Sequence, residues 1–495
     1  HADATGLLDL GTTAGFDTEA RETPSIWKRF AEVCLHTALQ FCEKNTHPFQ
    51  WAIIQNNLGG VLLGLADFAT GATSAHLLEQ SAEAYSEALQ VYTKENTPIL
   101  WATTQANLGG ILSHRAHIIE GTEGEDLLKQ AVEAYRVALS ICTQEQYPIL
   151  SSTIQSSLGV VLLDQAQRTV GVNRADLLKQ AFKLCQAASQ EYLKEYIPIE
   201  WAKMQSNLGN VLCDLASQHK GTDCSKLLVD AIEAYRSALQ ICTQERTPTL
   251  WAAVQNNLGT ALYSLTLQNE GETRPSFFDQ AMQAYQAALQ VRSYEERPFD
   301  WAATQFNIGK LLRDQAQLVG PTAIDMLKQA LEAFHSILQV YTRLYSPNDW
   351  ARTQHYLGIT LRDQAQRIKG DERIHLLHRA IEAHHNALQV YTKTYTPIDW
   401  AATQGSLATT LREQALYADV KTRTDLLSQS EQVCQSTFEV YSQEYTPTDW
   451  ADAHQEMAII LRDQALASEG DRCIDLLKQA VAAHQATLQV YTRKF

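Results

Sequence analysis

A tryptophan followed by alanine returns every fifty residues along this chain of 495 residues, and this spacing constrains the fold more than any other feature. Eight of the nine tryptophans keep the register with one single-residue slip, and Ser151 stands where the series is interrupted. The eight are Trp51, Trp101, Trp201, Trp251, Trp301, Trp350, Trp400 and Trp450. A fixed period of this length is typical of a solenoid, in which each unit is stable because it stacks on its neighbours.

Each unit contains two stretches with helical periodicity. In the copy at residues 98–148, the recurring positions of the first half fall three or four residues apart and share one helical face: Trp101, Gln105, Leu108, Leu112 and Ala116. A similar series begins at Leu127 after a polar break that contains glycine, and a proline opens the next copy. Proline suits the first turn of a helix, where its missing N–H is not needed. The unit is therefore predicted to be an antiparallel helical hairpin.

The period also predicts the organisation of the whole chain. Residues 1–23 show no period and are expected to be a tail or linker, residues 24–47 an N-terminal capping helix, and residues 48–495 nine helical hairpins. We expect the Trp-Ala pair of each unit to lie in the core. The eighth hairpin is expected to be the weakest, because Gly405 and Ala408 depart from the pattern.

Two motifs carry a resemblance to a known family. Asn107-Leu108-Gly109 in the first helix and Ala131 to Leu139 in the second resemble the two helices of a tetratricopeptide repeat (TPR), and the resemblance extends over residues 25–495. It implies an all-α, right-handed solenoid whose first helices line a concave groove for peptides. The unit is longer than the usual repeat of about 34 residues. The long repeat with its Pro-x-x-Trp-Ala start is similar to bacterial arrays that are often attached to a caspase-like protease domain or a nucleotide-driven switch domain.

Composition favours an all-helical intracellular protein, and we expect a cytoplasmic location. The nine cysteines never form a Cys-x-x-Cys pair, and four of them replace aromatic core residues: Cys142, Cys185, Cys242 and Cys434. No apolar run reaches the length of about 18 residues that a membrane-spanning helix needs. The chain begins at His1 without a visible signal peptide, which suggests a processed or excised fragment.

Several classes of function are disfavoured. A net charge of −16 argues against nucleic-acid binding, because the phosphate backbone needs a basic surface. No nucleophile elbow, phosphate-binding loop or Cys/His pair is present, so we predict no enzymatic activity and no cofactor. His378 and His385 lie above one another on a predicted helix, but the adjacent His384 takes a tyrosine position of the repeat. We therefore predict aromatic-like packing rather than a metal site.

An arginine stands four residues after the motif glycine or its equivalent in each of the last four hairpins. The four are Arg313, Arg362, Arg412 and Arg462, and an acid follows each of them. The resemblance places this column in the groove. One interpretation is a row of guanidinium groups that binds carboxylates or phosphates. The alternative is that each arginine pairs with an acid on the adjacent hairpin and only stiffens the stack.

Neighbouring columns change in character along the chain, from amides and small residues to bulky and basic ones. The positions that we predict to contact a partner besides the arginines are Asn256, Phe306, Lys310 and His355. The sequence thus predicts a scaffold or sensor that binds a protein or peptide of acidic character and regulates an effector domain outside this chain. The alternative is a receptor whose superhelix closes on a small anionic ligand through the arginines.

Overall fold

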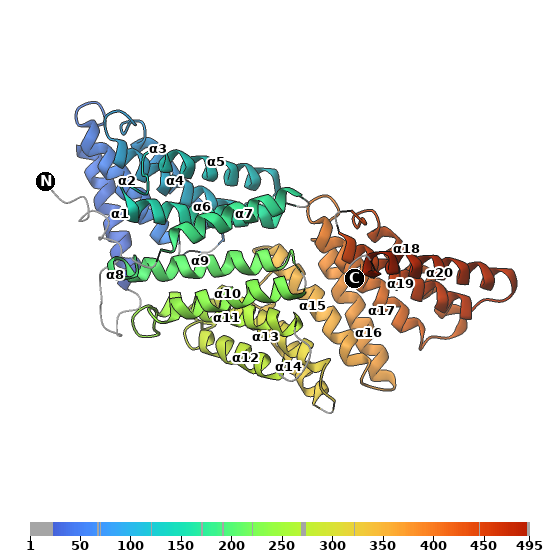
Figure 1. The fold of residues 1–495 in the computed structure, drawn as a ribbon. Helices are drawn as coiled ribbons and strands as arrows, with labels where there is room; N and C mark the ends of the chain where they lie inside the picture. Colours follow the sequence, from blue (N-terminus) through green and yellow to red (C-terminus); the bar gives the residue numbers. More distant parts are fainter. Residues whose placement is uncertain are drawn as a thin grey trace. The chain divides into compact units, whose positions relative to one another are not determined.

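All regular elements that the structure describes are helices. The computed structural model describes residues 23–66, 69, 71–119, 121–169, 172–190, 193–219, 221–268, 274–320, 322–444 and 446–492. Twenty helices follow one another within these ranges (Figure 1). The predicted all-α, TPR-like array of helical hairpins is confirmed. The predicted tail lies outside the described residues up to position 22.

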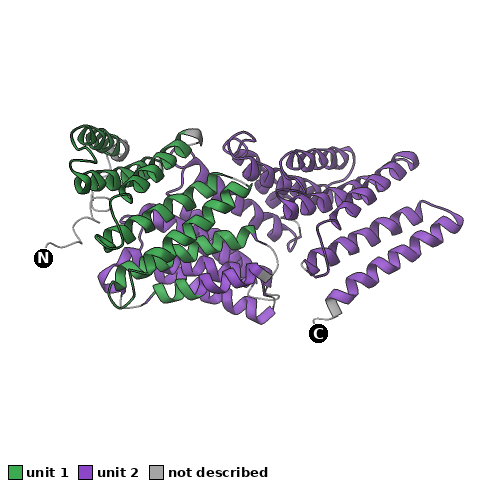
Figure 2. Cartoon of the chain, turned by 90° about the horizontal axis from the view of Figure 1, so that it is seen from above, with its two compact units in different colours: residues 1–168, 183–189 green, residues 169–182, 190–495 purple. Residues whose placement is uncertain are grey.

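The chain divides into two compact units, residues 1–168 with 183–189 and residues 169–182 with 190–495 (Figure 2). The helices of unit 1 are α1 (Thr23–Phe41), α2 (Pro48–Ala66), α3 (Gly71–Ala88), α4 (Pro98–Ile118), α5 (Gly121–Leu139) and α6 (Pro148–Arg168), while α7 (Val172–Ala188) divides between the units. Unit 2 contains α8 (Leu193–Tyr196), α9 (Pro198–Ala216), α10 (Gly221–Leu239), α11 (Pro248–Gln268), α12 (Arg274–Leu289), α13 (Pro298–Ala316), α14 (Ala323–Ile337), α15 (Pro347–Ala365), α16 (Asp371–Leu388), α17 (Pro397–Ala415), α18 (Val420–Thr437), α19 (Pro447–Leu466) and α20 (Gly470–Thr492).

Proline and glycine mark the helix boundaries of the repeat. Each first helix begins at the repeat proline, which fits the N-terminal turn because the N–H that proline lacks would have no partner there. The second helices of four hairpins follow or begin with a glycine in the left-handed region, for example Gly121 with φ 76° and Gly370 with φ 79°. Residues with a side chain rarely adopt this backbone conformation, so glycine permits the reversal between the two helices. We propose the leading helix and the nine hairpins as the structural divisions of the chain.

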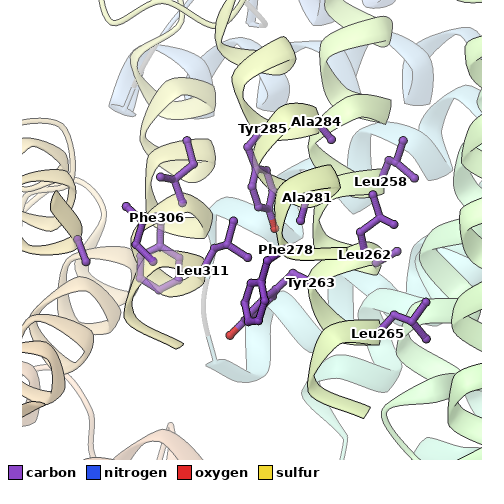
Figure 3. Packing of buried hydrophobic residues seen from close by; sticks show 14 of the residues in the cluster. Leu258, Leu262, Tyr263, Leu265, Phe278, Ala281, Ala284, Tyr285, Phe306 and Leu311 are labelled. Atoms are coloured by element: carbon purple, nitrogen blue, oxygen red, sulfur yellow. The ribbon is translucent and has the colours of Figure 1, made fainter. Parts of the chain in front are cut away.

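Hairpins gain their core from their neighbours. In unit 2 each first helix packs against the second helix that follows it and, from α11 onward, against the second helix that precedes it. Leu258 and Leu262 from α11, Phe278 and Tyr285 from α12, and Leu311 from α13 belong to one such continuous core (Figure 3). Unit 1 repeats this arrangement, with α3 between α2 and α4 and α5 between α4 and α6.

The alanine of the Trp-Ala pair is more deeply buried than the tryptophan. Every alanine of the series, from Ala52 to Ala451, is fully buried, whereas Trp201 is the only tryptophan of the series that is buried. The others are half-buried and lie at the margin of the core. The expectation that each Trp-Ala pair lies in the core is therefore right for the alanine and only partly right for most of the tryptophans, which pack against the core from its margin. A flat ring can cover the seam between hairpins from one side while its other side stays in water.

The motif glycine is explained by a ring that crosses beneath it. A Cβ at Gly259 would lie 2.7 Å from Cε1 of Tyr285, and one at Gly358 would lie 2.6 Å from Cε1 of His384. These rings come from the second helix of the same hairpin, and both are fully buried, so they cannot move aside. The glycine therefore sets how closely the two helices approach.

Two glycines on adjacent first helices provide a test of this packing. Gly358→Ala should lower the free energy of unfolding by about 1–3 kcal/mol, because the new methyl group overpacks the His384 ring. Gly405→Ala should raise it by about 1 kcal/mol, because a Cβ there meets nothing within 4 Å and alanine is the better helix former. Urea unfolding measures whether each variant has a lower or a higher free energy of unfolding than the wild type. Equal changes in the two variants would contradict the explanation that the buried ring requires the glycine.

Candidate functional site: the first-helix face of unit 2

The predicted contact residues lie on successive first helices of unit 2. We call the positions three before, one after and four after the motif glycine, or the residue that replaces it, the first-helix face. Asn256 lies on α11, Phe306, Lys310 and Arg313 on α13, His355 and Arg362 on α15, Arg412 on α17 and Arg462 on α19. Consecutive first helices from α9 to α19 contact one another directly, so the face is continuous within unit 2.

Asparagine side chains connect the first half of this face. Asn256 donates its amide to Oδ1 of Asn257 at 3.2 Å and accepts a hydrogen bond from Nδ2 of Asn307 on α13, also at 3.2 Å. Asn257 in turn donates to Oδ1 of Asn210 on α9 at 2.9 Å. Asn256 is thus part of a chain of amides that crosses three hairpins. Its hydrogen bonds stabilise the stack before any partner is present.

Aromatic rings surround the lysine of the face. Nζ of Lys310 lies 5.5 Å from the ring centre of Tyr263 and 5.3 Å from that of Tyr356, and Cζ of Arg313 lies 5.3 Å from the same Tyr356 ring. Phe306 meets Tyr356 edge-on at 5.1 Å and is only 5% exposed. Both tyrosines therefore attract cations with the faces of their rings, and Phe306 forms the floor of this cluster rather than its surface.

Arg313 and its acid are part of a half-buried polar cluster. Nε of Arg313 donates to Oδ1 of Asp314 at 2.8 Å, and the Tyr263 hydroxyl on the preceding hairpin donates to Oδ2 of the same carboxylate. Burial raises the pKa of Tyr263, and the nearby Asp314 charge raises it further. The phenol therefore stays protonated and serves as a hydrogen-bond donor between α11 and α13.

The four arginines fall into different environments. Arg412 pairs across the hairpin boundary, with Nε 2.9 Å from Oε1 of Glu456 and Nη1 3.3 Å from Oδ2 of Asp463. Burial opposes the charge of Arg412, but the two acids outweigh it and raise its pKa. Arg362 donates to Asp363, its neighbour on α15, at 3.1 Å. The side chain of Arg462 is 54% exposed and pairs with Asp463.

Two histidine rings lie close together near Arg362: His355 belongs to the face, and His384 lies on α16. The rings of His355 and His384 are 5.7 Å apart, and both nitrogens of His384 and Nδ1 of His355 are buried without a hydrogen-bond partner. Burial lowers the pKa of His355 to about 4 and that of His384 well below its ordinary value, and the positive charge of Arg362 acts in the same direction. Both rings are therefore neutral at pH 7. The predicted aromatic-like role of His384 fits its complete burial.

The histidine pair predicts acid sensitivity. The unfolded chain binds protons at these histidines near pH 6.5 and the folded chain does not, so stability is complete above that pH and falls as the pH drops. Each histidine contributes up to about 1.4 kcal/mol per pH unit. His384→Phe should stabilise the protein by about 1–3 kcal/mol at pH 7, because it removes two buried nitrogens that have no hydrogen-bond partner. It should also make stability depend less steeply on pH. Thermal unfolding between pH 7 and pH 4.5 measures the stability and its pH dependence, and an unchanged pH dependence would contradict a neutral, buried His384.

Metal binding receives no support from the part of the chain that the structure describes. No group of three histidine, cysteine or acidic side chains with metal-binding geometry occurs there. His378, one of the two histidines considered from the sequence, hydrogen-bonds to Nε2 of Gln414 at 2.8 Å. Among the described helices, none combines the length and apolar character needed to cross a bilayer.

The sequence columns missed the residues that shape the site. Tyr356 and Glu456 occupy the position two before the glycine or its equivalent, where most hairpins have asparagine, such as Asn257. Tyr263 stands in the arginine column of α11. The available signal was a tyrosine and a glutamate in a column that otherwise contains asparagine or serine. The sequence could not show what this signal means, because Glu456 forms its ion pair with Arg412 of the preceding hairpin.

The comparisons with known proteins give solved structures of low similarity. No protein-family model and no curated protein matches the chain. Pseudomonas aeruginosa pilF is 17% identical with a TM-score of 0.35, and the match covers 59% of this chain and 92% of that one. The apo form of RapI is 14% identical with a TM-score of 0.41, covering 83% and 99%, and yeast Tom70 is 11% identical with a TM-score of 0.31, covering 94% and 93%. The helical hairpins and the repeat motifs of this chain make it an all-helical, TPR-like repeat protein.

Proposed function

We propose that the chain is a non-enzymatic, cytoplasmic interaction module whose first-helix face binds an acidic protein or peptide segment. Within a longer protein, this binding would control an effector domain. The observation that carries the proposal is Lys310, which is half-buried between the rings of Tyr263 and Tyr356. Its ammonium forms no ion pair with any residue that the structure describes. A lysine held in this way would present an unpaired, half-buried positive charge to a partner.

Arg313 and Arg362 also support the binding of an acidic partner at the first-helix face. Among the described residues, each donates hydrogen bonds only to the acid that follows it on its own helix. Such a pair orients the guanidinium group and leaves other N–H groups for a second carboxylate. Arg412 differs, since its donors already reach Glu456 and Asp463. The acid-binding zone therefore centres on α13 and α15 rather than on the whole arginine column.

The charge balance makes this zone unusual for the chain. Arg313 and Arg362 are each paired with one acid, whereas Lys310 on α13 forms no ion pair with a described residue, in a chain whose net charge is −16. Glu413 lies close enough to Arg362 to offset part of its charge. The unpaired ammonium group of Lys310 would therefore attract an acidic partner to α13.

A labelled oligoglutamate peptide tests the proposal. Lys310→Met should weaken its binding about tenfold, which corresponds to about 1.4 kcal/mol. Lys393→Met is the matched control, because Lys393 is exposed, lies in the loop between α16 and α17, and is paired with Glu439. Fluorescence anisotropy at low and high salt should show a steeper loss for the wild type than for Lys310→Met. Equal affinities of the two variants would contradict the proposed face.

The alternative is a receptor for a small anion. The same half-buried cations favour it, because a phosphate ion could bridge Arg313 and Arg362. Competition separates the two functions. If inorganic phosphate binds to the wild type and the peptide does not, the receptor function is supported and the peptide-binding function is contradicted.

A further inference from the structure

A small pocket lies apart from the lysine cluster, which consists of Lys310 with Tyr263 and Tyr356. The pocket is at the end of α15, where α15 meets α16 and α17. Its volume is about 230 Å³. Gln366 follows α15, Arg373 and Leu377 belong to α16, and Glu413 and Leu416 lie at the end of α17 with Tyr417. The pocket thus combines one cationic group, one acidic group and an apolar wall. Arg412 also lines it, but Glu456 and Asp463 neutralise that guanidinium.

Arg373 forms the cationic end of the pocket. Its Nε donates to the carbonyl oxygens of Ala365 at 3.1 Å and Ile368 at 2.6 Å, which fixes the guanidinium against the end of α15. The same group lies over the ring of Tyr417 at 4.4 Å. Its two terminal nitrogens donate to no described residue. A guanidinium with its terminal edge available is suited to a bidentate bond with a carboxylate.

Glu413 forms the acidic end. Nε2 of Gln366 donates to its Oε1 at 2.6 Å, while its second oxygen has no hydrogen bond to a described residue. The residue is 8% exposed. Burial raises the pKa of Glu413, and the positive charge of Arg362 partly opposes this. An ammonium group beside this carboxylate would supply the missing donor and favour its ionised form.

The wall between the two ends is apolar. Leu377 is buried, whereas Leu416 and Tyr417 are 49% and 46% exposed. An apolar side chain placed here would cover surface that now faces water. The charges at both ends also select the ligand, because an anion alone would meet Glu413 and a cation alone would meet Arg373.

We propose that this pocket binds a free amino acid with an apolar side chain. Its carboxylate pairs with the terminal nitrogens of Arg373, its ammonium group lies at Glu413 and Gln366, and its side chain packs on Leu416 and Tyr417. The site is independent of the lysine cluster, so the peptide-binding proposal can fail without affecting it.

Isothermal titration calorimetry with L-leucine tests the proposal on the whole chain. Saturable binding of one equivalent is expected, with a Kd on the order of 1 mM for a ligand of this size. 4-Methylpentanoate, which lacks the amine, and 3-methylbutylamine, which lacks the carboxylate, should each bind at least about tenfold more weakly. Absence of L-leucine binding, or equal binding of all three compounds, would overturn the proposal.

Variants locate the site and control for folding. Arg373→Lys should weaken L-leucine binding about tenfold, and Glu413→Gln should do the same. Arg423→Lys is the matched control, because Arg423 makes the corresponding bonds one hairpin later, and its Nη2 already donates to the carbonyl of Ala418 at 3.1 Å. Because the Tyr417 side chain is exposed, Tyr417→Ala provides a second test of L-leucine binding if Arg373→Lys destabilises α15. Unchanged affinity in Tyr417→Ala and Glu413→Gln would place L-leucine elsewhere.

Discussion

Replacing Arg412 with alanine is expected to lower the free energy of unfolding of the last two hairpins by about 3–5 kcal/mol. The Arg412 side chain is 14% exposed, and it holds Glu456 at 18% and Asp463 at 7% exposure. Removing the guanidinium leaves Glu456 poorly solvated without its ion-pair partner, and it leaves Asp463 with only the exposed Arg462. The lost solvation of Glu456 and its repulsion by Asp463 cost more than the ion pair itself contributes.

Arg462→Ala provides the control, because Arg462 bonds to the same Asp463 from an exposed position. Its loss should cost no more than about 1 kcal/mol, as for other surface pairs. Urea unfolding with hydrogen exchange across α17–α20 measures both variants. If Arg462→Ala proves as costly as Arg412→Ala, burial does not distinguish the two arginines, and the division of the column between stabilising and binding members is wrong.

The second large effect is expected at Trp201. Trp201→Ala should lower stability by about 3–5 kcal/mol, because the side chain is 1% exposed and the cavity cannot collapse within a packed hairpin. Nζ of Lys194 lies 4.9 Å from the ring centre, so the substitution also removes a cation–π contact. This loss should appear first in α9 and α10.

Trp251 is the comparison for Trp201. The repeat pattern treats the two tryptophans alike, but Trp251 is only half-buried. Trp251→Ala should therefore cost clearly less, since less apolar surface returns to water. Differential scanning calorimetry of both variants decides the matter. Equal losses would mean that the period, and not the burial at each position, determines the energetic role of the tryptophan.

The hairpin architecture could be predicted from sequence because its causes are local and recur every fifty residues. Helical periodicity, the proline at the first turn and the glycine between helices act within one unit. The reason for the motif glycine was less accessible, since the ring beneath Gly259 belongs to Tyr285 on the other helix. A residue column shows that glycine recurs, but not which ring requires it.

The candidate site was only partly predictable. The arginine column was visible, yet Arg313 and Arg412 differ through partners on other helices, which no column displays. Phe306 looked like a contact residue because it is bulky, but packing against Phe334 and Tyr356 buries it. Lys310 gains its significance from two tyrosines on neighbouring hairpins. Such contacts depend on the stacking of hairpins rather than on any single unit.

Hydrogen–deuterium exchange with and without a saturating acidic peptide tests the central claim most directly. The account predicts slower exchange in α13 and α15 around Lys310 and Arg362, with little change in α18 and α20. It also predicts that Lys310→Met removes this protection while Arg462→Ala retains it. Protection confined to α17–α20, or protection that persists in Lys310→Met, would contradict the claim that the lysine cluster of the first-helix face binds the partner.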